Sequence, residues 1–180
     1  MRLNAPNGFK TRPTSDRVKE ALFSILDSNN LLEQAQVLDL CAGSGSLGIE
    51  ALSRGAVHTV FVEKDRAALQ SLQSNLARTG FPVQQYEVLA LDCRQALTLL
   101  VRRQTLFNLV LFDPPYQSDL YQSVIPLVGS NLLMAEGVLV AETAARVPLP
   151  DRLPPCVRTD QRLYGDTVLN FFMLEPHHAS

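Results

Sequence analysis

Five short apolar segments, separated by more polar segments, constrain the fold of this chain more than any other feature. They predict strands at residues 36–41, 58–63, 84–90, 107–112 and 137–143. Helical periodicity between them predicts helices at residues 46–54, 65–79, 93–103 and 119–131. Buried strands that alternate with helices form parallel sheets covered on both faces, because their crossover connections are right-handed. We therefore predict a doubly wound α/β fold with a mostly parallel sheet.

The two ends of the chain depart from this alternation. Residues 18–26 repeat apolar side chains at helical spacing, and Thr14 or Ser15 can cap this helix, which we expect to end near Asn29. Near the other end, Tyr164-Gly165-Asp166-Thr167 is typical of a hairpin turn. A terminal hairpin makes the last strand antiparallel to its neighbour. Its two strands are predicted at residues 157–163 and 168–174.

The length and composition of the chain favour a single globular domain. It has 180 residues, of which 46% are hydrophobic and 19% charged, so it is long enough to bury a substantial core. We predict one domain over residues 1–180, with an N-terminal basic arm and helix in residues 1–30 and the α/β core in residues 36–174.

Charge is unevenly distributed along the chain. The net charge of −2 is not the overall signature of a nucleic-acid-binding protein. Residues 1–20 nevertheless contain five basic and two acidic side chains, so this arm carries +3 and the remainder −5. The arm is either a solvated terminus or a local nucleic-acid contact. In the second case the contacting residues are Lys10, Arg12 and Lys19.

The three cysteines, Cys41, Cys93 and Cys156, argue against a disulfide framework or a zinc site. Their number is odd and no pair has the spacing of a metal-binding motif. We expect reduced thiols, a cytoplasmic protein and no metal. No segment has the length of a membrane span, and residues 1–10 lack the apolar core of a signal peptide.

A glycine-rich segment, Gly43-Ser44-Gly45-Ser46-Leu47-Gly48, lies between the first predicted strand and the helix after it. This pattern fits sites for several nucleotide-like cofactors, NAD and FAD included, because glycine lets the backbone approach a ligand closely. Glu63 ends the next predicted strand, 18 residues after Gly45. A carboxylate there accepts hydrogen bonds from both hydroxyls of a ribose, unless it is simply solvated beside Lys64 and Asp65.

Two further aspartates lie at strand ends. Asp39 falls inside the first predicted strand, where an unbonded carboxylate is costly. We expect it to accept hydrogen bonds from loop amides or, through water, from the amino group of a cofactor. Asp92 follows the third predicted strand and either binds an adenine amino group or caps the helix that begins near Cys93.

The tetrapeptide Asp113-Pro114-Pro115-Tyr116 directly follows the buried fourth strand. The carboxyl ends of the first and fourth strands border the same crevice in a doubly wound sheet, which places Asp113 near the cofactor. An aspartate carboxylate and the Pro114 carbonyl can accept both N–H bonds of a planar amine, while the prolines stiffen the loop. Tyr116 offers a face on which a flipped base stacks. The pattern predicts methyl transfer from S-adenosylmethionine to an exocyclic nitrogen.

Three blocks of the sequence resemble the bacterial 16S rRNA guanine-N2 methyltransferase family. They are residues 12–23 (RPTSDRVKEALF), residues 38–56 (LDLCAGSGSLGIEALSRGA) and the tetrapeptide at residues 113–116, with the segment at residues 164–167 also similar. The resemblance spans roughly residues 12–174. It implies a Rossmann-like class I methyltransferase fold with a seven-stranded sheet.

The resemblance also implies a substrate and a set of site residues. The substrate would be a guanine of 16S rRNA in the small ribosomal subunit or an assembly intermediate. The sequence leaves the oligomeric state of the protein open, with a monomer favoured. The tetrapeptide would bind the target amine, and the segment from Thr14 to Arg17 would close over the cofactor. The other cofactor-binding residues would be Asp39, Cys41, Gly43, Ser44, Gly45, Glu63, Lys64, Asp92 and Cys93.

The chain departs from the family pattern at two places. Family members usually begin with a longer segment rich in Arg and Gly, whereas Met1–Thr11 is short and keeps only Arg2 and Lys10. Cys41 occupies a position where a bulky aromatic residue is common, and we expect it to be a small apolar filler.

Four other functions share part of this pattern. A DNA adenine-N6 or cytosine-N4 methyltransferase uses the same tetrapeptide but usually needs extra sequence to recognise a duplex. A protein-glutamine methyltransferase favours Asn at the position of Asp113. An NAD-dependent oxidoreductase explains Gly43–Gly48 and Glu63 but not the tetrapeptide. A non-catalytic cofactor-binding module on the ribosome also leaves the tetrapeptide unexplained.

Overall fold

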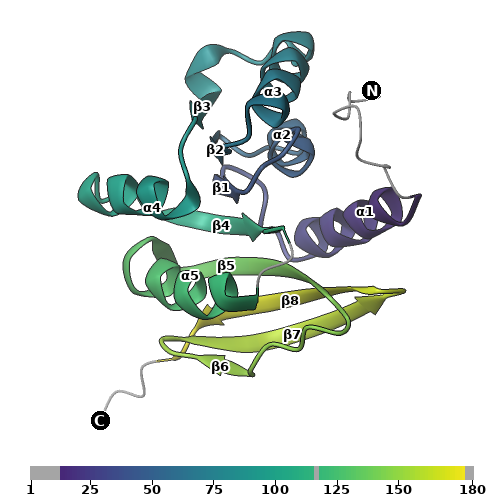
Figure 1. Cartoon of the computed structure of the whole chain (residues 1–180), viewed down its shortest axis with the longest axis vertical. Coiled ribbons are helices and arrows are strands. Elements are labelled where there is room, and N and C mark those ends of the chain that lie inside the picture. Colours follow the sequence, from purple (N-terminus) through teal and green to yellow (C-terminus); the bar gives the residue numbers. More distant parts are fainter. Residues whose placement is uncertain (1–12, 116–117, 177–180) are drawn as a thin grey trace.

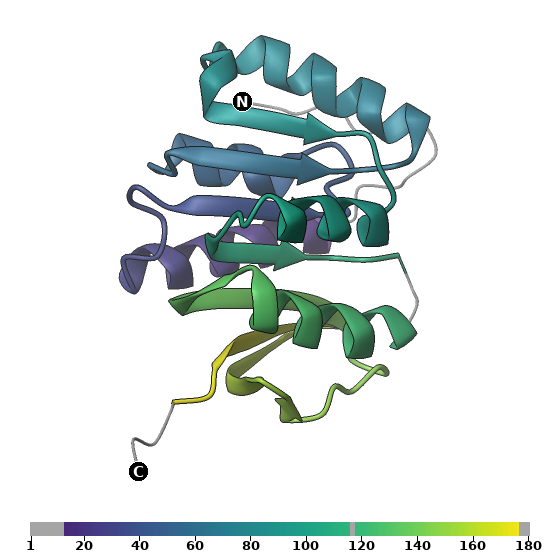
Figure 2. The same ribbon diagram turned by 90° about the vertical axis from the view of Figure 1, so that its left-hand side faces the viewer.

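One mixed sheet organises the whole molecule. The computed structural model describes residues 13–115 and 118–176, without the side chains of residues 13–15 and 118. Its strands lie in the order β3-β2-β1-β4-β5-β8-β7-β6 (Figures 1 and 2). They are β1 (Gln36–Leu40), β2 (His58–Val62), β3 (Tyr86–Leu89), β4 (Phe107–Phe112), β5 (Leu133–Ala144), β6 (Arg152–Leu153), β7 (Cys156–Tyr164) and β8 (Thr167–Leu174).

Strands β1 to β5 are parallel, and the C-terminal strands are antiparallel. β8 runs antiparallel to β5, β7 antiparallel to β8, and β6 antiparallel to β7. The predicted hairpin is therefore confirmed, as is the mostly parallel α/β sheet. The register between β7 and β8 shifts between Arg158 and Asp160.

Helices cover both faces of the sheet, as Figure 2 shows. α1, α2 and α3 share one core with Val37, Leu109 and Val140 of the sheet. α4 and α5 share the other with Leu38, Val110 and Leu139. Because neighbouring residues of a strand face opposite cores, the central strands are apolar along their length. The helices are α1 (Pro13–Ser28), α2 (Ser46–Ser53), α3 (Arg66–Thr79), α4 (Cys93–Arg102) and α5 (Ser118–Asn131).

Local sequence signals explain where several helices begin and end. The Asp65 side chain accepts a hydrogen bond from the Ala68 amide at the start of α3, and Gly80 ends that helix with φ +72°. α1 begins at Pro13, so the prediction that Thr14 or Ser15 caps it is wrong. Proline suits the first turn of a helix, where its missing N–H would have no helical partner.

Three predicted strand features differ from the structure. Over the described residues the sheet has eight strands rather than seven, because Arg152–Leu153 pairs with β7 as a short edge strand. β3 begins at Tyr86, since residues 83–85 form a 3₁₀ turn after Pro82. β5 starts earlier than predicted, at Leu133, which is buried and pairs with Phe107 across a register shift.

The strand order places the crevice of a doubly wound fold between β1 and β4. β1 pairs with β2 on one side and with β4 on the other, so the chain leaves β1 in one direction and returns to its opposite side. Loops from the carboxyl ends of these two strands diverge at such a point and leave room for a ligand. Among the residues that the structure describes, no helix is long and apolar enough to cross a membrane.

Candidate active site

The glycine-rich loop joins β1 to α2 in a left-handed backbone conformation. Gly43 has φ +57° and Gly45 has φ +79°. A Cβ atom at Gly43 would meet no atom within 4 Å, so this part of the loop faces open space. A Cβ atom at Gly45 would lie 2.3 Å from the Leu72 side chain of α3. Gly45 thus serves packing, and Gly43 is the glycine that leaves the backbone open to a ligand.

Several polar groups hold this loop in place. The Glu63 carboxylate, at the end of β2, accepts hydrogen bonds from the backbone amides of Gly43, Lys64 and Asp65, each at 2.8 Å. The buried Asn75 amide on α3 donates to the Ser44 carbonyl oxygen at 3.0 Å. Sequence analysis missed Asn75, although a polar residue on the apolar side of a helix was an available signal. The loop is therefore fixed by both β2 and α3.

Asp39 lies below the loop with only 2% of its surface exposed. Its carboxylate accepts a 2.9 Å hydrogen bond from the Gly48 amide in the first turn of α2, so a loop-region amide is indeed its partner. Burial raises the pKa of Asp39 to about 7, and the charges of Asp113 and Glu63 add to the rise, while the Gly48 bond opposes it. This carboxyl group is the most deeply buried acid of the site.

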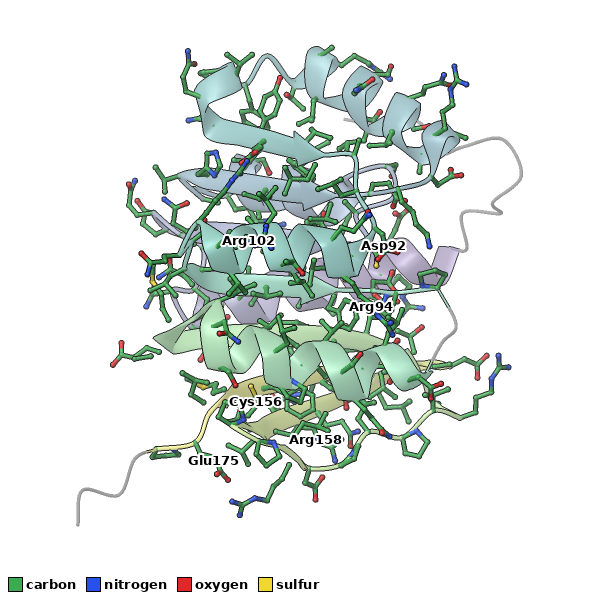
Figure 3. The ribbon with its side chains drawn as sticks, turned by 60° about the vertical axis from the view of Figure 1, so that its left-hand side comes forward. Asp92, Arg94, Arg102, Cys156, Arg158 and Glu175 are labelled. Atoms are coloured by element: carbon green, nitrogen blue, oxygen red, sulfur yellow. The ribbon has the colours of Figure 1, made fainter. Side chains whose placement is uncertain are left out.

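Asp92 acts as a helix cap in the structure. Its carboxylate accepts a hydrogen bond from the Arg94 amide at 2.9 Å, and the Gln95 side chain accepts one from the Asp92 amide. Figure 3 shows Asp92 and Arg94 at the same end of α4. The second carboxylate oxygen of Asp92 lies 3.4 Å from the Lys64 ammonium, which leaves that oxygen open to a further donor.

The thiols of Cys41 and Cys93 meet beside this loop. Cys41 follows β1 with φ +60°, and Cys93 opens α4. A hydrogen bond between the two thiols, together with burial, raises the pKa of Cys41. Both are free thiols that pack against the core on the α4 and α5 side, in keeping with the filler role expected for Cys41.

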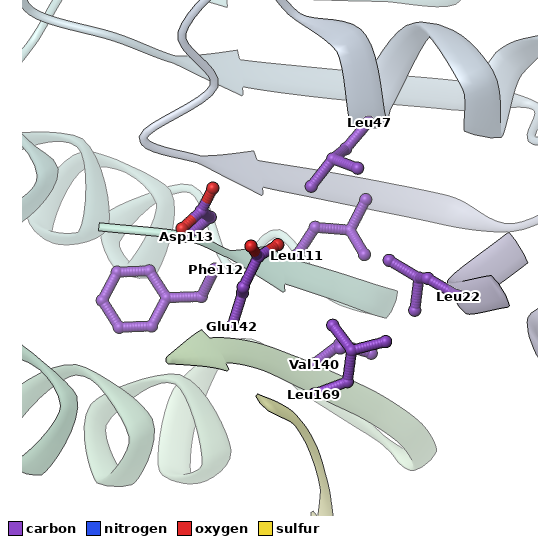
Figure 4. A pocket seen from close by; sticks show the side chains of 8 residues that line it. All are labelled: Leu22, Leu47, Leu111, Phe112, Asp113, Val140, Glu142 and Leu169. Carbon is purple, nitrogen blue, oxygen red and sulfur yellow. The ribbon is translucent and has the colours of Figure 1, made fainter. Parts of the chain in front are cut away.

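Asp113 leaves the carboxyl end of β4 at the crevice. Its side chain is open to solvent, Pro114 is buried and Pro115 is exposed. The protein packed around the Asp113 carboxyl group removes part of its hydration and raises its pKa to about 6. Figure 4 shows this carboxyl group beside that of Glu142, with Leu47 of α2 and Leu22 of α1 nearby. Tyr116 lies outside the described residues.

Glu142 is a second residue of the site, besides Asn75, that the sequence did not predict. It lies near the end of β5 and lines a small cavity together with Asp113. Burial raises the pKa of Glu142 to about 8, and the neighbouring charge of Asp113 adds to the rise. The Tyr121 hydroxyl donates a 2.7 Å hydrogen bond to the Glu142 carbonyl oxygen. An acidic residue within the otherwise apolar segment 137–143 was the available signal.

Residues from the N-terminal helix reach the loop at one described contact. The Lys19 ammonium donates a 3.0 Å hydrogen bond to the Ser46 hydroxyl at the start of α2. Arg17 is exposed on the same helix. The predicted contacts of Lys10, Arg12 and the Thr14 side chain lie outside the described residues.

The carboxyl ends of four neighbouring strands thus bring four acids to one edge of the sheet. Their carboxyl oxygens can accept hydrogen bonds. The pKa values of Asp39, Asp113 and Glu142 are raised because the surrounding protein removes hydration, and neighbouring charges add to the rise at Asp39 and Glu142. Such a site favours ligands that carry N–H donors or positive charge. The four acids are Asp39 on β1, Glu63 after β2, Asp113 after β4 and Glu142 on β5.

Comparison with known proteins agrees with this architecture. The family model described as "Conserved hypothetical protein 95" matches residues 1–173. YlbH of Bacillus subtilis, provisionally named as an rRNA methyltransferase, is 38% identical over 166 residues, which are 92% of this chain and 89% of that protein. Ribosomal RNA small subunit methyltransferase D of Escherichia coli is 37% identical over 143 residues, 77% of this chain and 67% of that protein.

A solved structure shows the same fold over nearly the whole chain. The Escherichia coli protein yhhF, provisionally described as a methyltransferase, has a TM-score of 0.81 at 30% identity and covers 98% of this chain and 93% of its own. The family model, the relatives and this fold agree with the resemblance seen in the sequence. The chain therefore belongs to the ribosomal RNA small subunit methyltransferase D family.

Proposed function

We propose that this protein transfers a methyl group from S-adenosylmethionine to the exocyclic N2 amine of a guanine in 16S rRNA. The observation that carries the proposal is the position of Asp113 and Pro114 at the carboxyl end of β4, next to the glycine-rich loop that follows β1. The relatives support this substrate class, since one of them is named for the RNA of the small ribosomal subunit. The protein would encounter the small ribosomal subunit in the cytoplasm.

The residues around the loop fit a nucleoside cofactor. Gly43 leaves open space above the backbone, and Glu63 and Asp92 are carboxylates at the ends of β2 and β3. Glu63 already accepts three backbone bonds through two oxygens, so it would share its remaining acceptor capacity with the ribose hydroxyls. When bound, S-adenosylmethionine supplies a methyl group on a positively charged sulfur. The negative charge of Asp39, when it is ionised, would favour binding of that cation.

Asp113 would act as the catalytic residue that orients the amine. With a pKa of about 6, its carboxyl group is mostly ionised at neutral pH and accepts one N–H bond of the guanine amine. The Pro114 carbonyl oxygen would accept the other, so that the nitrogen lone pair turns away from the ring. The proton released from nitrogen would pass to Asp113 or to solvent. Such orientation lowers a barrier by roughly 7–11 kcal/mol.

The target base would have to leave its helix to reach this site. Extruding a base costs a few kcal/mol, and less when it is unpaired. Tyr116 would stack on the extruded base, for about 1–3 kcal/mol. Lys10, Arg12 and Lys19 would contact the RNA backbone, with Thr14 and Arg17 closing over the cofactor.

The test is methyl transfer from tritiated S-adenosylmethionine to small ribosomal subunits that have not been methylated by an enzyme of this family. Nucleoside mass spectrometry then identifies the labelled product. We expect labelled N2-methylguanosine from the wild-type protein and none from Asp113→Ala, with cofactor affinity unchanged within about threefold. The matched control is Asp119→Ala, an exposed aspartate on α5. Label in adenine or cytosine, or full activity of Asp113→Ala, would contradict the proposal.

A further inference from the structure

The carboxyl group of Glu142 has no part in the chemistry proposed above, although it faces the same space as Asp113. Phe112 pairs with Ala141 in the parallel register of β4 and β5. The next residue of each strand is an acid, so Asp113 and Glu142 leave the sheet at the same level and toward the same side. Figure 4 shows their two carboxyl groups next to each other at the wall of one cavity.

The surroundings of Glu142 offer its carboxyl group nothing to bind. The other residues that line the cavity are apolar: Leu22, Leu47, Leu111, Phe112, Val140 and Leu169. Within residues 13–115 and 118–176, neither a hydrogen bond nor an ion pair reaches the Glu142 carboxyl oxygens. Glu142 is only half-buried, so its carboxyl group is within reach of the polar atoms of a ligand.

Two titratable groups face Glu142 from the elements packed against it. They are Asp113 after β4 and Tyr121 on α5, and Tyr121 directs its hydroxyl to the Glu142 backbone. Two neighbouring acids do not both ionise readily, because the charge of one opposes the ionisation of the other. The pKa of Glu142, about 8, is the higher of the two, and the pKa of Asp113 is about 6. Glu142 is therefore mainly a neutral acid, with one hydrogen-bond donor and one acceptor.

The edge of guanine next to its N2 amine matches such a group. The ring atoms that follow the amine are N1–H, a donor, and then the O6 acceptor. A neutral carboxyl group accepts from N1–H through its carbonyl oxygen and donates its O–H to O6. Adenine and cytosine instead place a bare ring nitrogen, which is an acceptor, beside their amine, so neither offers the ring N–H donor of guanine. A residue that reads this edge therefore separates guanine from the other amine-bearing bases.

We propose that Glu142 selects the target base by binding the N1–H and O6 edge of the guanine whose N2 amine Asp113 holds. This inference rests on the proposed function and names a specificity residue for it. The enclosed cavity has a volume of about 10 Å³, which is room for about one water molecule. The base ring would thus lie outside the enclosed volume, with only its polar edge reaching the two acids.

The test compares guanine with 2-aminopurine at the methylated position. 2-Aminopurine keeps the 2-amino group but lacks O6 and the N1 hydrogen. Once the wild-type reaction has located its guanine, splinted ligation places either base there in small-subunit rRNA, and kcat/KM is measured for both particles. The wild-type protein should prefer guanine by about tenfold or more, which is the value of one to two hydrogen bonds.

Variants at Glu142 then distinguish recognition of the base by Glu142 from a structural role of its side chain. Glu142→Gln should keep the preference, since an amide offers the same donor and acceptor. Glu142→Leu suits the apolar cavity and should lower kcat/KM for guanine to the level of 2-aminopurine. Glu142→Ala should have the same effect, and it takes the place of Glu142→Leu in the test if the leucine variant does not fold. Glu136→Leu, at the exposed far end of the same strand, should keep the wild-type preference.

Each way in which the proposal could be wrong gives a different experimental result. A guanine preference that survives in Glu142→Leu and Glu142→Ala would overturn the role of Glu142. Equal losses on both substrates would assign it a structural role, and a tenfold loss of S-adenosylmethionine affinity in calorimetry, with the preference intact, would assign it to the cofactor. A wild-type protein that binds S-adenosylmethionine but labels no guanine would instead overturn the proposed function itself.

Discussion

The Lys19 ammonium on α1 donates a hydrogen bond to the Ser46 hydroxyl at the start of α2, at 3.0 Å. The bond joins the helix that precedes the sheet to the end of the glycine-rich loop. The sequence predicts that Lys19 contacts RNA, and that role stays a prediction. Its described partner gives it a second role, which is to fix α1 against the loop.

A double-mutant cycle measures this bond. Lys19→Met and Ser46→Ala should each lower the free energy of unfolding by about 0.5–1.5 kcal/mol, because each removes one partner of a partly buried hydrogen bond. Together they should cost no more than the larger single loss. Urea denaturation gives the three values, and Glu20→Gln, exposed on the same helix, is the control. Additive losses would mean that the two side chains act independently.

Asp39→Asn should make the protein more stable at pH 8 and lower its cofactor affinity. Asp39 has a usual pKa of 3.8 and a pKa of about 7 in the folded protein. The folded protein therefore holds the proton more tightly than the unfolded chain, and stability falls as pH rises from about 4 to about 7. Asparagine cannot ionise but can still accept the Gly48 bond. Its gain should be near zero at pH 4 and on the order of 2–4 kcal/mol at pH 8.

Thermal and urea unfolding at pH 4, 6 and 8 check this pH dependence for both proteins. Calorimetric titration with S-adenosylmethionine checks the functional loss in parallel. If the asparagine variant were less stable than wild type at pH 8, the buried carboxylate would be a net stabilising group, contrary to the prediction.

Thr59→Val should raise the free energy of unfolding by about 1 kcal/mol. The Thr59 side chain is fully buried on β2, and its hydroxyl has no hydrogen-bond partner among the described residues. Valine has the same shape without the unpaired hydroxyl. Thr143→Val is the matched comparison, because the Thr143 hydroxyl accepts a 3.1 Å bond from Asn170. That change should cost about 1–3 kcal/mol, and equal effects of the two in urea denaturation would refute the assignment.

Methyl transfer should weaken as pH falls through about 6. The Asp113 carboxyl group has a pKa of about 6, and only its ionised form accepts the amine hydrogen bond in the proposed reaction. One pH unit below that value about a tenth of the protein is ionised, so kcat/KM should drop about tenfold between pH 7 and pH 5. Asp113→Asn should keep some activity with a flat acidic limb. An unchanged acidic limb in this variant would assign the titration to another group.

The positions of many strands and helices can be predicted from short-range patterns in the sequence. Apolar runs of five or six residues located β1, β2 and β4 within a residue or so, because strands buried on both faces leave a continuous signal. Gly80 and Asp65 mark the ends of α3 by their local chemistry. The edge strand Arg152–Leu153 has no such signal, since two residues carry no period and only pairing with β7 makes them a strand.

Some residues of the candidate site could likewise be predicted from the sequence, and others could not. Residues next to strand ends, such as Asp39, Glu63 and Asp113, were predicted because their place in the chain fixes their place on the sheet. Glu142 was not, since its importance depends on the register between β4 and β5, which brings it level with Asp113. Asn75 likewise depends on how α3 packs against the loop. Sequence patterns locate elements, whereas relations between elements need the tertiary structure.

Within the described residues, most of β7 has no strand on its outer side. The short strand β6 pairs there with Cys156 and Val157, and the Arg158 amide donates to the Asp151 carbonyl oxygen. An unpaired strand edge is a template for aggregation with another chain. Here the register shift between β7 and β8, at Arg158 and Asp160, makes β7 irregular, and the Asp160 and Arg162 side chains form an ion pair on the same strand. At the other border β3 is only four residues long. In the described part of the chain both borders of the sheet are therefore short or irregular, which disfavours edge-to-edge pairing with another chain.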